Sequence, residues 1–275
     1  MTYRRIQLRP LAGALGAEVA GVDLAELDDA CFAEIHSAWL AHQVLFFRDQ
    51  DLSPDQHKAF GRRFGALQIH PFLHSRAAEG HPEIVVLESD EQRPVVAAGW
   101  HTDVTFAERP PMASILRGVE VPAWGGDTMW ASCGAAYEAL SSTMQRLLEG
   151  LSAVHDTSKT FSRDAYPSER HPEAGQAPSA LHPVVRTHPE TGRKALFVNP
   201  AFTLRIKGMR RDESEALLGF LYRHITTPEF TCRFRWEKGS LAIWDNRCTQ
   251  HRVVADNVKA HRRMERVTVE GDRPA

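Results

Sequence analysis

The pattern of apolar and polar positions predicts a few helices set among short strands. Apolar residues three or four positions apart predict amphipathic helices over about 27–41, 53–64, 137–150 and 212–224. Ser53 with Pro54 and Gln56 has the arrangement of a capped helix start. Asp212 is expected to cap the last helix in the same way.

Short apolar or alternating runs between turn residues predict β-strands. We expect them at 14–20, 44–47, 84–87, 113–121, 128–130, 184–185, 195–198, 231–236, 241–244 and 264–269. The sequence contains no regular strand–helix–strand alternation, no Gly-x-Gly-x-x-Gly and no phosphate loop, which argues against a nucleotide-binding fold. The predicted fold class is mainly β with helical decoration, as in an antiparallel barrel or jelly roll.

Length and composition predict one folded domain over residues 1–275. The chain is 43% hydrophobic and 25% charged, and no Gly/Ser-rich linker divides it. Residues from about 162 to 180 lose all periodicity, so we expect a lid-like insertion there. A net charge of -2 gives no reason to expect a nucleic-acid partner, and no apolar run is long enough to span a membrane.

Four cysteines are scattered along the chain without a Cys-x-x-Cys pair: Cys31, Cys133, Cys232 and Cys248. This spacing argues against a structural zinc site and against a disulfide framework. With a polar N-terminus unlike a signal peptide, it predicts free packing cysteines in a reducing cytoplasm.

The stretch Gly99–Phe106 carries the first candidate chemistry. It places His101 and Asp103 two residues apart. If the segment is extended, both side chains project from the same face. A second histidine from elsewhere would complete a 2-His-1-carboxylate triad, which leaves positions open on a non-heme Fe(II) centre.

His251 is the best candidate for that second histidine, because it follows the apolar strand 241–244 and a polar turn. Chance alone would supply about one His-x-Asp in a chain with fourteen histidines, so the pair carries little weight without a third ligand. The other histidines examined are expected to be core, surface or loop residues: His42, His57, His155, His224, His261, His70, His81, His171, His182 and His188.

Arg262 and Arg266 are four residues apart in the last predicted strand. In an extended segment both would project to one face, with Arg263 and Glu265 on the other. Two guanidinium groups directed into a barrel require anions, and a guanidinium binds carboxylate or sulfonate oxygens as a fork. The alternative is an ordinary surface pair of arginines.

Four motifs occur in order: Trp-His-Thr-Asp-Val-Thr-Phe, Gly-Gly-Asp-Thr, Trp-Asp-Asn-Arg-x-Thr-Gln-His and a final Arg-Arg-Met-Glu-Arg. With these motifs, almost the full chain resembles the taurine dioxygenase family of Fe(II)/2-oxoglutarate-dependent oxygenases. The resemblance implies a double-stranded β-helix in which His101, Asp103 and His251 hold Fe(II). It also implies that Arg262 and Thr128 bind the far carboxylate of 2-oxoglutarate and that O2 is consumed.

The same resemblance implies a small-molecule anionic substrate. A sulfonate group would be held by His70, Arg266 and the backbone N–H of Val104, with Phe161 and Phe202 as pocket walls. Members that act on taurine receive its amine at two further positions, which here hold Leu73 and Ala97.

An ammonium group that faces Leu73 and Ala97 would lack polar partners, and a buried charge without a partner is costly. We therefore expect an alkyl or aryl sulfate or sulfonate, oxidised at the carbon that bears the anion. Taurine and a carboxylate such as an aryloxyalkanoate are the alternatives, and a non-enzymatic metal-binding barrel is the alternative outside this chemistry. Relatives with this fold also lead us to expect a homo-oligomer, either a dimer or a tetramer.

Overall fold

A computed structural model of the chain describes residues 3–93, 98–160 and 178–275. Its largest sheet has eight strands in the order β1-β2-β3-β14-β6-β16-β5-β4. Neighbouring strands in it are antiparallel except β2 and β3. The strands of this sheet are β1 (Gln7–Pro10), β2 (Ala17–Ala20), β3 (Val44–Phe47), β4 (Ala77–Ala78), β5 (His81–Ser89), β6 (Ala113–Glu120), β14 (Leu241–Asp245) and β16 (Arg262–Val269).

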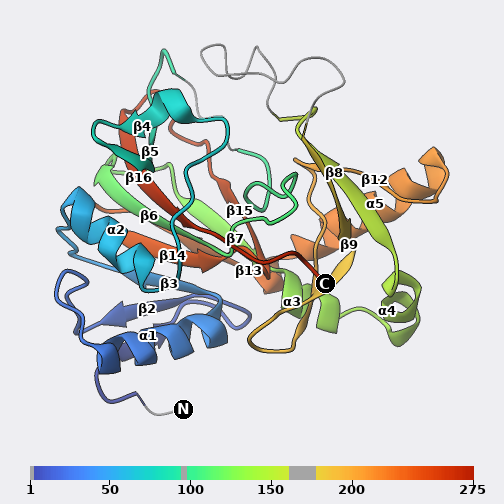
Figure 1. The fold of residues 1–275 in the computed structure, drawn as a ribbon, viewed down its shortest axis with the longest axis horizontal. Coiled ribbons are helices and arrows are strands. Elements are labelled where there is room, and N and C mark those ends of the chain that lie inside the picture. Colours follow the sequence, from blue (N-terminus) through green and yellow to red (C-terminus); the bar gives the residue numbers. More distant parts are fainter. Residues whose placement is uncertain (1–2, 94–97, 161–177) are drawn as a thin grey trace.

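A second layer faces the large sheet. Its three-stranded part has the order β13-β7-β15, with β7 (Thr128–Ser132), β13 (Thr231–Phe234) and β15 (Thr249–Val253). The two layers enclose a core rich in aromatic residues, in which Phe46 stacks on Phe234 and Trp130 meets Trp244 edge to face. This arrangement is a jelly roll, and Figure 1 shows the β13-β7-β15 layer beside the larger sheet.

Helices α1 (Asp29–His42) and α2 (Pro54–Arg62) cover the outer face of the large sheet (Figure 1). They cover it because their apolar faces form a second core with β3, β14 and β16, centred on Trp39 and Phe60. The capping box predicted at α2 is confirmed, since Ser53 and Gln56 each accept a hydrogen bond from the other's backbone N–H.

The remaining elements pack at the other end of the molecule around a third core. They comprise α3 (Cys133–Glu138), α4 (Ser142–Leu148), α5 (Arg211–Ile225), a 3-10 turn at Pro228–Phe230, and the strands β8 (Ser152–Asp156), β9 (Ser179–Pro183), β10 (Val185–Thr187), β11 (Lys194–Leu196) and β12 (Thr203–Ile206). Another 3-10 turn, at His74–Arg76, lies beside β5 of the large sheet instead. Strands β12, β8 and β9 form one small sheet, and β10 and β11 form another.

Several predicted boundaries are wrong. The helix expected over 137–150 is two helices, because Ser141 begins a new one by accepting a hydrogen bond from the Met144 N–H. The N-cap of α5 is Arg210, and Asp212 lies in the first turn instead. Of the strands in the described residues, six were not predicted, namely β1, β4, β8, β9, β12 and β15, and the strand expected at 14–20 begins only at Ala17.

The four cysteines are free, as predicted. Among the described residues, no helix combines the length and apolarity that crossing a bilayer requires. The lid-like insertion expected over 162–180 lies outside the described residues up to 177, and β9 already begins at Ser179.

His57, predicted to be an ordinary surface or core histidine, provides a test of this packing. It is fully buried on α2 and bonds the Ile115 carbonyl, and burial lowers its pKa to about 3. Below about pH 6.5 the unfolded chain binds a proton at this position that the folded chain does not, so stability falls as the pH falls, by up to about 1.4 kcal/mol per pH unit. We expect His57→Gln to lose stability less steeply than the wild type between about pH 6 and pH 4 in urea unfolding.

His261→Gln is the control with the opposite sign. Glu88 and Glu120 raise the pKa of His261, so its contribution is present at low pH and is lost as the pH rises through the folded-state value. Removing His261 should therefore not reduce the steepness with which the free energy of unfolding falls between about pH 6 and pH 4. Equal slopes for the wild type and His57→Gln would contradict the assignment of a neutral buried imidazole.

Candidate active site

Two histidines distant in sequence are held side by side by backbone hydrogen bonds. His101 and His251 form an isolated antiparallel bridge, in which the N–H of each donates to the carbonyl of the other at 3.0 and 2.8 Å. Directly opposite residues project to the same face, and the two imidazole centroids are 4.1 Å apart. The predicted partner of His101 is therefore placed beside it by strand pairing.

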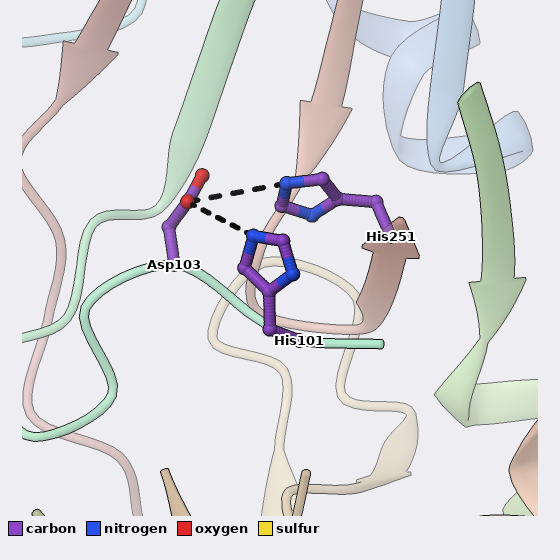
Figure 2. Close-up of side chains that lie close together, drawn as sticks. All are labelled: His101, Asp103 and His251. Atoms are coloured by element: carbon purple, nitrogen blue, oxygen red, sulfur yellow. Dashed lines mark ion pairs between the residues drawn. The ribbon is translucent and has the colours of Figure 1, made fainter. Parts of the chain in front are cut away.

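Asp103 reaches the same point by a different route from the one we predicted. The segment is not extended beyond His101, because residues 103–106 form a turn and Val104 has φ of +51°. The turn nevertheless directs the Asp103 carboxylate at both rings, with Oδ1 3.9 Å from Nε2 of His101 and 3.9 Å from Nε2 of His251. Figure 2 shows both rings turned toward this oxygen.

The donor set fits a divalent first-row metal ion. The ligand atoms of His101, Asp103 and His251 lie within 4.8 Å of one another, and all three residues are buried or nearly so. Nδ1 of His101 donates to the Gly99 carbonyl at 2.9 Å, which leaves Nε2 without a proton and directed at the cluster. Two imidazoles and one carboxylate with open positions are typical of non-heme Fe(II) sites.

Electrostatics keep this set in its ligating form. Burial lowers the pKa of both His101 and His251, so both rings are neutral. Burial alone would raise the pKa of Asp103, but the positive charge of Arg266, together with the hydrogen bond from Ser114, holds it well below its usual range. The cluster therefore offers two lone pairs and one negative charge, as metal binding requires.

Arg262 enters the same cavity as an unpaired cation. It is buried, and its Nε and Nη2 have no hydrogen-bond partner among the described residues. Burial lowers its pKa to about 10, only partly offset by Asp127, so it remains charged near neutral pH. Thr128 lines the cavity too, and because its Oγ1 accepts from Trp236 Nε1 at 2.9 Å, its own O–H is left to donate.

The predicted anion-binding residues lie at the same cavity. Arg266 donates from Nη1 to Asp103 Oδ1 at 2.9 Å, while its Nε has no partner in the described part of the chain. Nδ1 of His70 accepts from the backbone N–H groups of Phe72 and Leu73, so its ring proton is on Nε2. Arg266 thus has a donor group beyond its bond to Asp103, as an anion site needs, and His70 lies at the same cavity.

The cavity has a volume of about 430 Å³, and much of its wall is apolar. Leu73, Val104 and Phe202 are buried residues of this wall. Lys159 lines the cavity as well, and its Nζ donates to the Thr203 carbonyl at 2.7 Å. The predicted positions Ala97 and Phe161 lie outside the described residues.

A second buried cluster has metal-ligand residue types but is already saturated. His188, Asp245 and Cys248 lie together, yet both carboxylate oxygens of Asp245 accept hydrogen bonds from Arg247, and one also accepts from His188. His188 is a loop residue, as expected, between β10 and β11, and it is also buried in this network. A metal ion there would have to displace a guanidinium, so the cluster is structural.

Comparison with known proteins decides the family. The model of the "Taurine catabolism dioxygenase TauD, TfdA family" matches residues 7–268. The chain belongs to this family. It is 39% identical to an alkylsulfatase of Acinetobacter baylyi, over 98% of this chain and 86% of the relative. It is 40% identical to an alpha-ketoglutarate-dependent sulfate ester dioxygenase of Pseudomonas putida, over 98% and 91%.

Solved structures agree with this TauD/TfdA assignment. A taurine dioxygenase from Burkholderia xenovorans superposes with a TM-score of 0.85 at 42% identity, over 99% of this chain and 93% of the other. The predicted fold class is therefore confirmed, and the chain is an oxidoreductase of the dioxygenase class.

The residues that hold the turn of this TauD/TfdA site were missed by the sequence analysis. The hydroxyl of Thr105 bonds Nδ1 of His155 at 3.0 Å and Nδ2 of Asn199 at 3.1 Å. Nε2 of His182 donates to the Thr105 carbonyl at 2.9 Å. Both histidines were expected to be ordinary core or loop residues, and only their placement on β8 and β9 shows that they face residues 103–107.

His101→Ala tests the metal site directly. We expect it to weaken Co(II) binding to the metal-free protein by more than about 100-fold, because one of three protein ligands is lost. The melting temperature of the metal-free protein should change little. His42→Ala is the matched control, since His42 lies in the last turn of α1 away from the cavity. Titration calorimetry measures the Co(II) affinity of both variants, and thermal unfolding measures their melting temperatures. Unchanged Co(II) affinity in His101→Ala would rule out the cluster as the metal site.

Proposed function

We propose that this protein is an Fe(II)- and 2-oxoglutarate-dependent dioxygenase that oxidises an organic sulfate ester or sulfonate at the carbon next to the anionic group. The relatives named for alkylsulfatase and sulfate ester dioxygenase activity support the substrate class. The site supports the cofactors: a His/Asp/His cluster for Fe(II) and a buried cation for the cosubstrate.

The observation that carries the proposal is the state of Arg262. A buried guanidinium with two nitrogens unpaired among the described residues is unfavourable unless an anion completes it. It lies in the same cavity as the metal cluster, so the anion belongs to a molecule that also reaches the metal. A dicarboxylate such as 2-oxoglutarate meets that requirement, with Arg262 and Thr128 at its far carboxylate.

His101, Asp103 and His251 would hold Fe(II), which when bound supplies O2 activation and the oxidation of a substrate C–H bond. The residues of the chain bind and orient the two organic molecules around it. His70, Arg266 and the backbone N–H of Val104 would hold the substrate anion. The apolar wall excludes water from the reacting carbon.

Leu73 is the feature that favours an apolar substrate tail. It is buried and lines the cavity at a position where an amine-bearing substrate would need a polar partner. Burying an ammonium against leucine costs several kcal/mol, so taurine is disfavoured. An alkyl or aryl group instead gains about 25 cal/mol for each Å² that it buries.

The reaction balances without a further reactant. One oxygen atom of O2 enters 2-oxoglutarate, which leaves as succinate and CO2. The other becomes a hydroxyl on the carbon that bears the sulfate or sulfonate. That hemiacetal-like product loses sulfate or sulfite as its O–H proton departs, and an aldehyde remains.

We also propose that the 275 residues form one domain and that the protein acts in the cytoplasm as a homo-oligomer. The free cysteines support a reducing compartment. The match of one family model from residue 7 to residue 268 supports the single domain.

A substrate panel tests the substrate class. We expect a medium-chain alkyl sulfate to give succinate at least about tenfold faster than taurine at equal concentration, since Leu73 accepts a tail and rejects an ammonium group. Succinate release and aldehyde formation are measured together, and an aryloxyalkanoate serves as the carboxylate arm. A taurine rate above the alkyl sulfate rate would end the argument from Leu73.

Arg262→Gln tests the cosubstrate site. Loss of a charge-assisted fork should raise the KM for 2-oxoglutarate by about 100-fold while leaving Co(II) affinity within about threefold. Arg263→Gln is the matched control, because this neighbour pairs loosely with Glu265 and does not line the cavity. An unchanged KM in Arg262→Gln would show that another residue binds the far carboxylate.

A further inference from the structure

A chain of buried hydrogen bonds ends on the metal-facing carboxylate. Trp244 Nε1 donates to Asn246 Oδ1 at 3.0 Å, and Asn246 Nδ2 donates to Ser114 Oγ at 3.1 Å. Ser114 Oγ then donates to Asp103 Oδ2 at 2.7 Å. All four residues are at most 4% exposed, so water does not compete for these bonds.

Each proton in this chain has a single possible direction. An indole N–H can only donate, so the amide of Asn246 must present its oxygen to Trp244 and its NH2 to Ser114. Ser114 Oγ therefore accepts from Asn246 and has its own proton left for Asp103. Trp244 therefore fixes the direction of the hydrogen bond that Ser114 donates, with Asn246 as the link between them. We call this chain of hydrogen bonds the relay.

The strand register explains why this relay can form. Trp244 on β14 lies directly opposite Ser114 on β6, and Asn246 follows the end of β14. The Trp244 ring also packs against His251, with centroids 4.6 Å apart. One tryptophan thus contacts one imidazole of the cluster and is linked to the carboxylate through three successive hydrogen bonds.

We propose that Ser114 and Asn246 are positioning residues that fix the Asp103 carboxylate for metal binding. Ser114 holds Oδ2, so the oxygen that faces both imidazole Nε2 atoms at 3.9 Å is Oδ1, which also accepts from Arg266. A carboxylate presented through one oxygen would occupy a single ligand position on the metal and would leave others open for the organic ligands. The inference rests on the proposed function, because it assumes that this cluster holds the metal.

Co(II) affinity of the metal-free protein tests the inference without turnover. We expect Ser114→Ala to weaken Co(II) binding by about 10–100-fold, the usual effect of removing a residue that orients a metal ligand. The visible absorption bands of bound Co(II) should also change, because the carboxylate can rotate. Ser114→Thr keeps the hydroxyl and should stay within about threefold of the wild type, even though its extra methyl lowers the melting temperature.

Ser132→Ala is the matched control for a buried serine. Its hydroxyl donates to Gln43 and caps α3 away from the cluster, so its loss should lower stability without changing Co(II) affinity. Ser114→Ala within threefold of the wild type would overturn the inference, as would an equal loss in Ser132→Ala.

A double substitution tests the direction of the relay. Asn246→Leu alone should weaken Co(II) binding, whereas in the Ser114→Ala background it should add less than it does alone. The reason is that its Nδ2 acts on the carboxylate through Ser114, while its Oδ1 accepts only a long bond, at 3.5 Å, from the Asp103 N–H. Fully additive losses would overturn the relay. Failure of the wild type itself to bind Co(II) would instead overturn the proposed function, so the two failures are distinguishable.

Discussion

The backbone bridge between His101 and His251 is the constraint on which the site depends. A single pair of reciprocal hydrogen bonds joins a loop residue to strand β15, and the two rings follow because opposed residues share a face. Asp103 then needs only a short turn to reach both rings. The turn holds Val104, a β-branched residue, at φ of +51°, a conformation that persists only where surrounding contacts impose it.

Charge explains why this cavity suits anionic ligands. Arg262, Arg266 and Lys159 bring three positive charges to it, a divalent metal would add two more, and Asp103 supplies the single negative charge of the cluster. Such an excess in a largely apolar cavity is stable only when ligands bring negative charge. A dianionic cosubstrate and a monoanionic substrate would offset most of it. Neutral molecules of the same shape would leave at least one guanidinium without a partner.

The sequence was sufficient to predict the residues of the site, but not the residues that hold them in position. His101, Asp103, His251, Arg262 and Arg266 were all singled out, and the structure brings all five to one cavity. The reason given for the His–Asp pair was wrong, since the segment turns instead of extending. The supports of that turn and of the carboxylate could not be predicted, because they depend on the register of β6 with β14 and on the packing of β8 and β9. No spacing in one sequence encodes those partners.

Strand β16 sets the distance between the two anion sites. Arg262 and Arg266 line one cavity from the same strand, and four residues of extended chain separate their backbones by about 13 Å. Arg266 donates to Asp103 and therefore lies beside the candidate metal ligands, whereas Arg262 lies farther along the strand. A short anion such as acetate could satisfy only one of these positions. A five-carbon dicarboxylate is long enough to reach both the cluster and Arg262, so the spacing along one β-strand favours a ligand of that length, as the proposed binding of 2-oxoglutarate requires.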